Sequence, residues 1–267
     1  MNAEEMNRKK QFVVSKLRYL ERRFGTQKRL LEEINAKIAT KLTGADLSRY
    51  ISGKTYPSGQ KLVELWNLLL SDYFNELHFQ RIISKHSHII EIEGNLQIDV
   101  SYLLSDARAL YTITDLALYR PLRTVDDTQV LLDELGITKV VTLEVDGIPF
   151  AAAMAASMGQ NVDMVYCRRT PTYDILERAE WGEYLFTPSD GRLQGLFLPK
   201  KYIKKGERVL IVDDVINSGV SIRALIRLVN QLEGVPVAVM VLYSHLKDFS
   251  KLKQDFPNVD FIVLYDQ

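Results

Sequence analysis

One segment, Val209–Ser221 (VLIVDDVINSGVS), restricts the fold more than any other part of the 267-residue chain. A short apolar run is followed by two adjacent carboxylates, Asp213 and Asp214, and then by a loop of small polar residues. A strand, a polar loop and a helix in this order are typical of α/β proteins, which bind ligands beyond the carboxyl ends of parallel strands. The helix is expected from Ser221 onward because apolar residues follow at helical spacing, at Ile222, Leu225, Ile226, Val229 and Leu232.

The rest of the C-terminal half repeats this alternation of strand and helix. Short apolar runs predict strands at 139–145, 162–167, 235–243 and 259–265, and a stretch of small residues predicts a helix at 147–159. Strands separated by helices in this way predict a parallel sheet with helices on both faces. Residues 170–198 form a long polar connection, which is typical of a functional flap.

The chemistry of Val209–Ser221 indicates a sugar phosphate as ligand. Free backbone N–H groups and the helix dipole favour an anion at a helix N-terminus, so the loop Asn217–Ser221 suits a phosphate. The two carboxylates before it suit the hydroxyls of a ribose, which donate hydrogen bonds. An ordinary strand–turn–helix with Ser221 as N-cap is the alternative, and the paired aspartates at the strand end argue against it.

This segment resembles the PRPP motif of the type I phosphoribosyltransferases, an apolar strand, two acidic residues, an apolar pair and a Ser/Thr- and Gly-rich loop. The resemblance implies that the carboxylates hold the ribose and that the loop cradles the 5-phosphate. The family usually has Thr-Gly-Gly-Ser/Thr in the loop, so Val220 stands in place of a glycine. The implied site for PRPP or a nucleotide is Asp213, Asp214, Val215, Ile216, Asn217, Ser218, Gly219, Val220 and Ser221.

Two upstream segments match the same family in the same order. LEVDGIPFAAAMA (143–155) resembles its pyrophosphate loop, which implies a pyrophosphate site at Asp146 and Gly147. YCRRTP (166–171) resembles the basic pair of the adenine and xanthine branches, which implies that Arg168 and Arg169 bind the same pyrophosphate. Taken alone, the first could be a generic strand–helix turn and the second a solvated surface. Residues 172–198 then correspond to the mobile catalytic loop, and the resemblance to the xanthine and purine-repressor branch covers about residues 100–267.

The N-terminal part of the chain differs in charge and periodicity. Residues 1–90 hold 16 Lys and Arg against nine Asp and Glu, whereas the remainder holds 18 against 25. The excess of positive charge suggests a polyanion as partner, although a solvated helical surface gives the same count. Helical spacing up to about residue 80 predicts an all-α domain at 1–80 before a ligand-binding domain at 81–267. Near the boundary, 81–110 predicts a hairpin or two short strands around Gly94 and Asn95, and 106–135 predicts a mostly helical stretch.

Leu42–Leu69 (LTGADLSRYISGKTYPSGQKLVELWNLL) is the second motif, and it resembles the Cro/repressor class of helix-turn-helix over about 27–70. Leu47, Tyr50 and Ile51 share one helical face and are expected to pack inward. Small polar side chains on the other face suit the major groove, and the residues after the helix suit phosphates. The expected DNA-binding residues are Thr43, Ala45, Asp46, Ser48, Arg49, Lys54, Thr55 and Tyr56. A helical dimerisation domain is the alternative.

The sequence therefore predicts an α/β domain with the type I phosphoribosyltransferase fold, preceded by an all-α helix-turn-helix domain. The predicted function is a homodimeric DNA-binding transcription regulator that binds operator DNA and senses PRPP or a purine nucleotide or base. The alternative is an active purine or orotate phosphoribosyltransferase, with no residue yet assigned a catalytic role. DNA binding needs no cofactor, whereas Mg²⁺ can accompany PRPP.

Composition bears on metal sites, disulfides and the location of the protein in the cell. No Cys/His cluster predicts a structural metal site, and the single cysteine, Cys167, permits no internal disulfide. The charged start MNAEEMNRKK is not a signal peptide, and no apolar run approaches the ~20 residues of a membrane helix. We therefore expect a cytoplasmic protein without a membrane partner.

Overall fold

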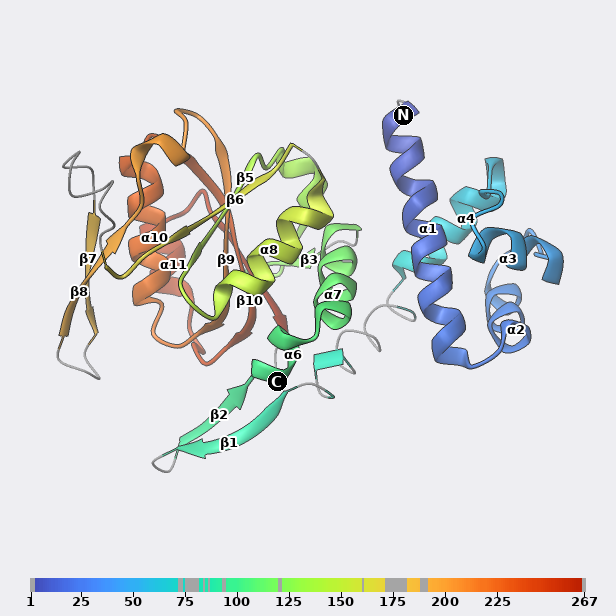
Figure 1. Cartoon of the computed structure of the whole chain (residues 1–267), viewed down its shortest axis with the longest axis horizontal. Coiled ribbons are helices and arrows are strands. Elements are labelled where there is room, and N and C mark those ends of the chain that lie inside the picture. The colour runs from blue at the N-terminus through green and yellow to red at the C-terminus, as the bar shows by residue number, and fades with distance from the viewer. Residues whose placement is uncertain are drawn as a thin grey trace. The chain divides into compact units, whose positions relative to one another are not determined.

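The computed structural model of the chain divides into two compact units, Met1–His78 and Phe79–Gln267 (Figure 1). Within these units the structure describes residues 3–71, 74, 82–83, 85, 87–92, 95–119, 122–159, 161–170, 182–187 and 192–265. No helix in these ranges combines the length and the apolar character needed to cross a membrane.

The first unit is all-helical. Its helices are α1 (Ala3–Phe24), α2 (Gln27–Lys37), α3 (Gly44–Ile51) and α4 (Gly59–Leu70). Helix α1 packs against the other three, and α2 packs against α3. The apolar side chains that point into this unit are fully buried, namely Leu17, Leu20, Leu30, Ile34, Leu47, Leu65 and Leu69. The helix spacing of the sequence thus produces a small core of its own in the first unit.

Side-chain caps fix where two of these helices begin. The Thr26 hydroxyl accepts a hydrogen bond from Arg29 N at the start of α2. At α3, Thr43 Oγ1 accepts from Asp46 N at 3.1 Å, and Asp46 Oδ2 accepts from Thr43 N at 3.2 Å. This reciprocal pair satisfies two backbone donors that a helix start would leave without partners. Ser58 occupies the N-cap position of α4 without a side-chain hydrogen bond to the helix.

The second unit is built on a five-stranded parallel sheet in the order β11-β10-β9-β5-β6. The strands are β5 (Lys139–Leu143), β6 (Asp163–Cys167), β9 (Arg208–Ile216), β10 (Val235–Ser244) and β11 (Asp260–Tyr265). Helices α7 (Ala107–Tyr119) and α8 (Gly147–Met158) cover one face, and α10 (Val220–Gln231) and α11 (Ser250–Asp255) cover the other (Figure 1). This is the parallel sheet with helices on both faces that the sequence predicts, and β9 lies at its centre.

Smaller elements precede the sheet. The predicted hairpin is present as antiparallel β1 (His88–Ile92) and β2 (Asn95–Asp99), followed by α6 (Ser101–Ser105). The expected helical stretch at 106–135 is correct for α7 and for the 3-10 helix η1 (Leu132–Leu135). It is wrong between them, where β3 (Leu122–Arg123) pairs with β4 (Gln129–Val130). Thr124 N donates to Thr128 O at 2.9 Å, and hydroxyls of both threonines contact Asp126, so side-chain hydrogen bonds favour a turn over a helix there.

The polar connection 170–198 contains a second hairpin that the sequence analysis did not predict. Strands β7 (Gly182–Thr187) and β8 (Arg192–Phe197) pair antiparallel, and β7 packs near α10 (Figure 1). Phe197 also exchanges both backbone hydrogen bonds with Arg168, which joins β8 to the end of β6. A short 3-10 helix, η2 (Lys200–Tyr202), follows. The predicted mobile loop at 172–198 falls partly on 172–181 and 188–191, which lie outside the described residues.

Candidate functional site

The acidic pair lies where the central strand loses one of its neighbours. Strand β10 pairs with β9 as far as Ile216, which lies opposite Ser244. On the other side, β5 pairs with β9 only as far as Ile211, opposite Val141. Asp213 and Asp214 therefore follow the point at which β5 and β9 separate. Strands that part at their carboxyl ends are where α/β sheets bind ligands.

The two carboxylates are costly to ionise in this position. Asp214 N donates to Asp213 Oδ1 at 3.1 Å, which holds the two side chains together. Withdrawal of the carboxyl groups from water raises the pKa of both, although each residue keeps partial exposure. The charge of Asp214 raises the pKa of Asp213 further, and the charge of Asp146 does the same to Asp214. Such a pair favours a ligand that brings hydroxyl donors or positive charge.

Gly147 brings the turn between β5 and α8 against the acidic pair. A Cβ on this residue would lie 2.2 Å from Thr142 Oγ1 and 2.9 Å from Asp213 Oδ1, so no other residue fits without displacing its neighbours. Asp146 precedes it at the N-cap of α8, is exposed, and makes no capping hydrogen bond. The structure thus places both predicted pyrophosphate-loop residues beside the predicted ribose site. The peptide bond between Glu144 and Val145 in this turn is cis.

The two arginines of the predicted basic pair make different contacts. Arg169 N donates to Glu144 Oε1 at 2.6 Å, which ties the end of β6 to the turn after β5. The charge of Arg169 also lowers the pKa of Asp213, so this guanidinium acts on the acidic pair. The Arg168 guanidinium instead donates to the Tyr166 hydroxyl at 2.8 Å and lies over that ring. Arg169 is therefore a cation that acts electrostatically on the acidic pair.

The predicted phosphate loop leads into α10 through a left-handed glycine. Gly219 has φ +73° and forms the N-cap, while Asn217 and Ser218 before it are exposed. The helix begins at Val220, one residue earlier than the expected Ser221. Because the positive φ falls at Gly219 and Val220 is already helical, valine in place of the family glycine causes no backbone strain. Gly219 at the N-cap has no side chain to cap the first turn of α10, and amides at a helix N-terminus are suited to bind an anion.

The first unit presents most of its predicted DNA-binding residues to solvent. Leu47, Tyr50 and Ile51 are buried, as the spacing predicted. The exposed residues are Thr43, Ala45, Ser48, Arg49, Lys54, Thr55 and Tyr56. Asp46 was expected to face outward and does not. Its side chain is only 14% exposed and is held by Arg49 and Lys61, because the capping box turns it back toward its own helix.

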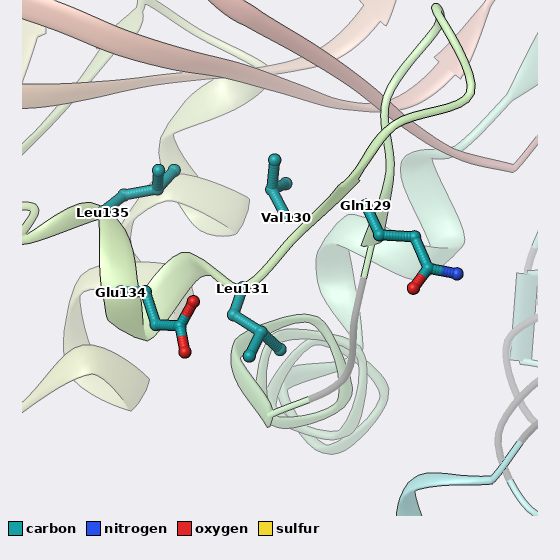
Figure 2. Close-up of a pocket in the computed structure, with 5 residues that line it drawn as sticks. All are labelled: Gln129, Val130, Leu131, Glu134 and Leu135. Carbon is teal, nitrogen blue, oxygen red and sulfur yellow. The ribbon is translucent and has the colours of Figure 1, made fainter.

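A cavity of about 340 Å³ lies away from these residues, at β4 and η1. Figure 2 shows its lining, in which Val130 and Leu131 point to opposite sides of the chain. Its lining residues are Gln129, Val130, Leu131, Glu134 and Leu135. It contains none of the predicted ligand-binding residues and lacks the carboxylates and open amides found at the end of β9.

Three contributors to these sites were not predicted from the sequence. The Thr142 hydroxyl lies against Gly147, the Glu144 carboxylate accepts a hydrogen bond from Arg169 N, and Lys61 contacts Asp46 from α4. Glu144 stands within the quoted LEVDG segment, so its proximity to the site was a usable signal. Lys61 lies 15 residues from Asp46, and only the fold of the first unit, in which α3 and α4 both pack against α1, brings them together.

Comparison with known proteins identifies the family of the second unit. The phosphoribosyl transferase domain model matches residues 128–263, which includes β5, α8, β6, β9 and α10. The chain belongs to the phosphoribosyl transferase domain family. Within this family it is 31% identical over 124 residues to a xanthine phosphoribosyltransferase of Streptococcus pyogenes. That match covers 46% of this chain and 62% of the enzyme, so it spans less than two thirds of the enzyme's length.

A second relative is a probable purine biosynthesis transcriptional regulator, PurR, of Streptococcus pneumoniae. It is 24% identical over 222 residues, and the match covers 76% of this chain and 79% of the regulator. Among solved structures, adenine phosphoribosyltransferase of Rhodothermus marinus aligns with a TM-score of 0.55 at 21% identity, over 71% of this chain and 98% of that one. The enzyme of Saccharomyces cerevisiae aligns with a TM-score of 0.54 at 22% identity, over 71% and 99%. At these identities the structures establish a shared fold.

Proposed function

We propose that this protein is a transcription regulator in which a phosphoribosyltransferase-like unit senses a ribose 5-phosphate ligand and a helical unit binds DNA. One observation carries the proposal: a basic helical unit with an exposed polar helix face and a phosphoribosyl transferase domain occur in one chain. The similarity to the streptococcal regulator covers 76% of this chain. The second unit alone makes up a smaller share of the chain, so the match extends beyond that unit. This supports a regulator over a free-standing enzyme.

The ligand is proposed to be PRPP or a purine nucleotide. Its 5-phosphate would accept hydrogen bonds from the amides at the start of α10, and its ribose hydroxyls would donate to Asp213 and Asp214. The ionised carboxylates gain hydrogen bonds on binding that offset their cost in the ligand-free protein. Arg169 would bring positive charge to the anionic group that lies beyond the ribose.

Mg²⁺ is proposed to enter with PRPP instead of occupying a site of its own. Asp213 and Asp214 offer oxygen ligands of the kind that Mg²⁺ prefers, and the raised pKa of both carboxyls fits a nearby cation. No group of three ligating side chains forms a metal site among the described residues. When bound, the ion would neutralise charge on pyrophosphate.

The protein is proposed to act as a homodimer. Helix α3 spans only eight residues, too few to specify a long DNA sequence, and two-fold proteins overcome this by reading two half-sites. Light scattering at micromolar concentration should give twice the mass of one chain. A monomeric mass both with and without DNA would exclude this arrangement.

The function is tested by selecting bound duplexes from a pool of random-sequence DNA with the full chain. We expect enrichment of one sequence, and we expect Arg49→Ala and Lys54→Ala to weaken its binding while calorimetry still detects binding of PRPP, GMP or AMP. If no sequence is enriched and the protein instead transfers phosphoribose to a purine base, the enzyme alternative replaces the regulator.

A further inference from the structure

Asp46 is the centre of a group of charged side chains on the first unit. Its Oδ1 accepts from Arg49 Nη2 at 2.9 Å and its Oδ2 from Lys61 Nζ at 3.0 Å. Arg49 belongs to α3 and Lys61 to the first turn of α4, so the carboxylate connects the two helices. Its side chain is 14% exposed, whereas those of Arg49 and Lys61 are 54% and 32% exposed. The two cations therefore lie between the carboxylate and solvent.

Both cations keep hydrogen-bonding capacity while they are held. A guanidinium has five N–H donors and an ammonium group has three. Among the described residues, Asp46 accepts one hydrogen bond from Arg49 and one from Lys61. The remaining donors can reach a ligand without breaking the contacts to Asp46. A second anion, such as a DNA phosphate, can therefore be bound by the same pair of side chains.

We propose that Asp46 is a positioning residue for DNA binding, which does not contact DNA but fixes Arg49 and Lys61 so that both engage it at once. The inference rests on the proposed DNA-binding function and adds Lys61 to the interface. It also replaces the sequence-based expectation that Asp46 itself reads the groove. Arg49 would contact the DNA from the outer face of α3, and Lys61 would bind a neighbouring phosphate of the DNA backbone.

The proposal predicts that loss of the Asp46 carboxylate weakens specific DNA binding, whereas net charge alone predicts stronger binding. A carboxylate on a DNA-binding surface repels phosphates, so its removal should strengthen binding that depends only on net charge. Long basic side chains lose rotamer freedom when they bind, and a side chain that is already held loses less. Fixed geometry matters most in a sequence-specific complex, where all contacts must form together. Asp46 should therefore help specific binding and hinder non-specific binding.

The charge needed for this role persists at ordinary pH. The hydrogen bonds from Lys61 and from the Thr43 backbone, together with that from Arg49, hold the pKa of Asp46 well below its usual range. The side chain also caps α3 through Thr43, so a variant must separate the two roles. Asp46→Asn keeps a carbonyl oxygen for Thr43 N but removes the charge that holds the two cations.

The test compares this variant with Glu32→Gln, which removes the same charge from an exposed position on α2. Binding is measured for a duplex selected by the wild-type chain and for an unrelated duplex of equal length. Glu32→Gln should bind both duplexes as tightly as wild type or slightly more so. Asp46→Asn should bind the selected duplex about tenfold more weakly, or 1.4 kcal/mol, and the unrelated one no more weakly than wild type.

A second variant keeps the inference testable if Asp46→Asn disturbs folding. Lys61→Gln leaves the Thr43 cap intact and should weaken binding of both duplexes, because it also removes a phosphate contact, with the larger loss for the selected duplex. In the double variant the two losses should be less than additive, because both remove the same arrangement. Tight binding of the selected duplex by Asp46→Asn, or strictly additive losses, would overturn the inference. Failure of the wild-type chain to enrich any sequence would instead refute the proposed function.

Discussion

Replacement of Asp213 by asparagine should stabilise the ligand-free protein and abolish ligand binding. Burial and the charge of Asp214 raise the pKa of Asp213, so ionisation of this carboxyl opposes folding. A carboxyl whose pKa is higher in the folded state by one pH unit costs about 1.4 kcal/mol once it is ionised. Asparagine removes this cost and keeps the oxygen that accepts from Asp214 N. Relief of such strain at a functional site commonly contributes about 0.5–2 kcal/mol.

The pH dependence gives the sign of the effect. A carboxyl with a raised pKa lowers stability progressively as the pH rises from its unfolded pKa, 3.8, to its folded one. The melting temperatures of wild type and Asp213→Asn should therefore converge near pH 4 and separate as the pH rises. Above the raised pKa the difference should be constant. About 1 kcal/mol corresponds to roughly 2–4 °C in a domain of this size.

The assay is thermal unfolding from pH 4 to pH 9, with calorimetry of PRPP and GMP binding at pH 8. Asp248→Asn is the matched control, since hydrogen bonds from Ser250 lower the pKa of this exposed carboxyl and its removal should not stabilise the protein. Equal melting temperatures for wild type and Asp213→Asn at pH 8, together with unchanged ligand binding, would refute the electrostatic account of the site.

Three further substitutions test separate parts of the account. Ser218→Asp places a carboxylate in the phosphate loop and should abolish binding of phosphorylated ligands in calorimetry; an unchanged Kd would show that the loop is misassigned. Asp146→Asn removes repulsion beside Asp214 and should tighten PRPP binding by up to about fivefold, or 1 kcal/mol, and weaker binding would contradict this. Lys54→Ala should reduce the slope of log K against log salt for duplex DNA by about one, and an identical slope would remove Lys54 from the interface.

The elements that could be predicted from the sequence are those whose signals are local. Apolar runs in the sequence predicted strands β5, β6, β9, β10 and β11. Strands of a covered parallel sheet are apolar along their length, so each can be recognised without knowing which strands it pairs with. The starts of α2 and α3 are local in the same sense, because the Thr26 and Thr43 side chains accept hydrogen bonds from residues only three positions ahead. The acidic pair and the glycine loop were visible because their chemistry lies within one continuous segment.

The features that were missed depend on contacts between distant residues. Strands β3 and β4 contain two residues each and are defined by their pairing alone. Strands β7 and β8 were hidden by the turn-forming residues around them and are held by a cross-strand ladder. Asp46 has the sequence position of a groove-reading residue, and only the approach of Lys61 from α4 shows that it is engaged within the unit. The division of roles between Arg168 and Arg169 likewise depends on Tyr166 and Glu144.

The central claim is that a ligand in the second unit changes the DNA affinity of the first. It is tested by fluorescence anisotropy, in which the full chain titrates a labelled duplex selected by the wild-type protein, with and without saturating PRPP, GMP or AMP. Coupling of about 1–3 kcal/mol predicts that at least one ligand changes the Kd for DNA by roughly 5- to 150-fold, and that Asp213→Asn shows no such change. An unchanged Kd in the presence of a ligand that calorimetry shows to be bound would contradict the claim.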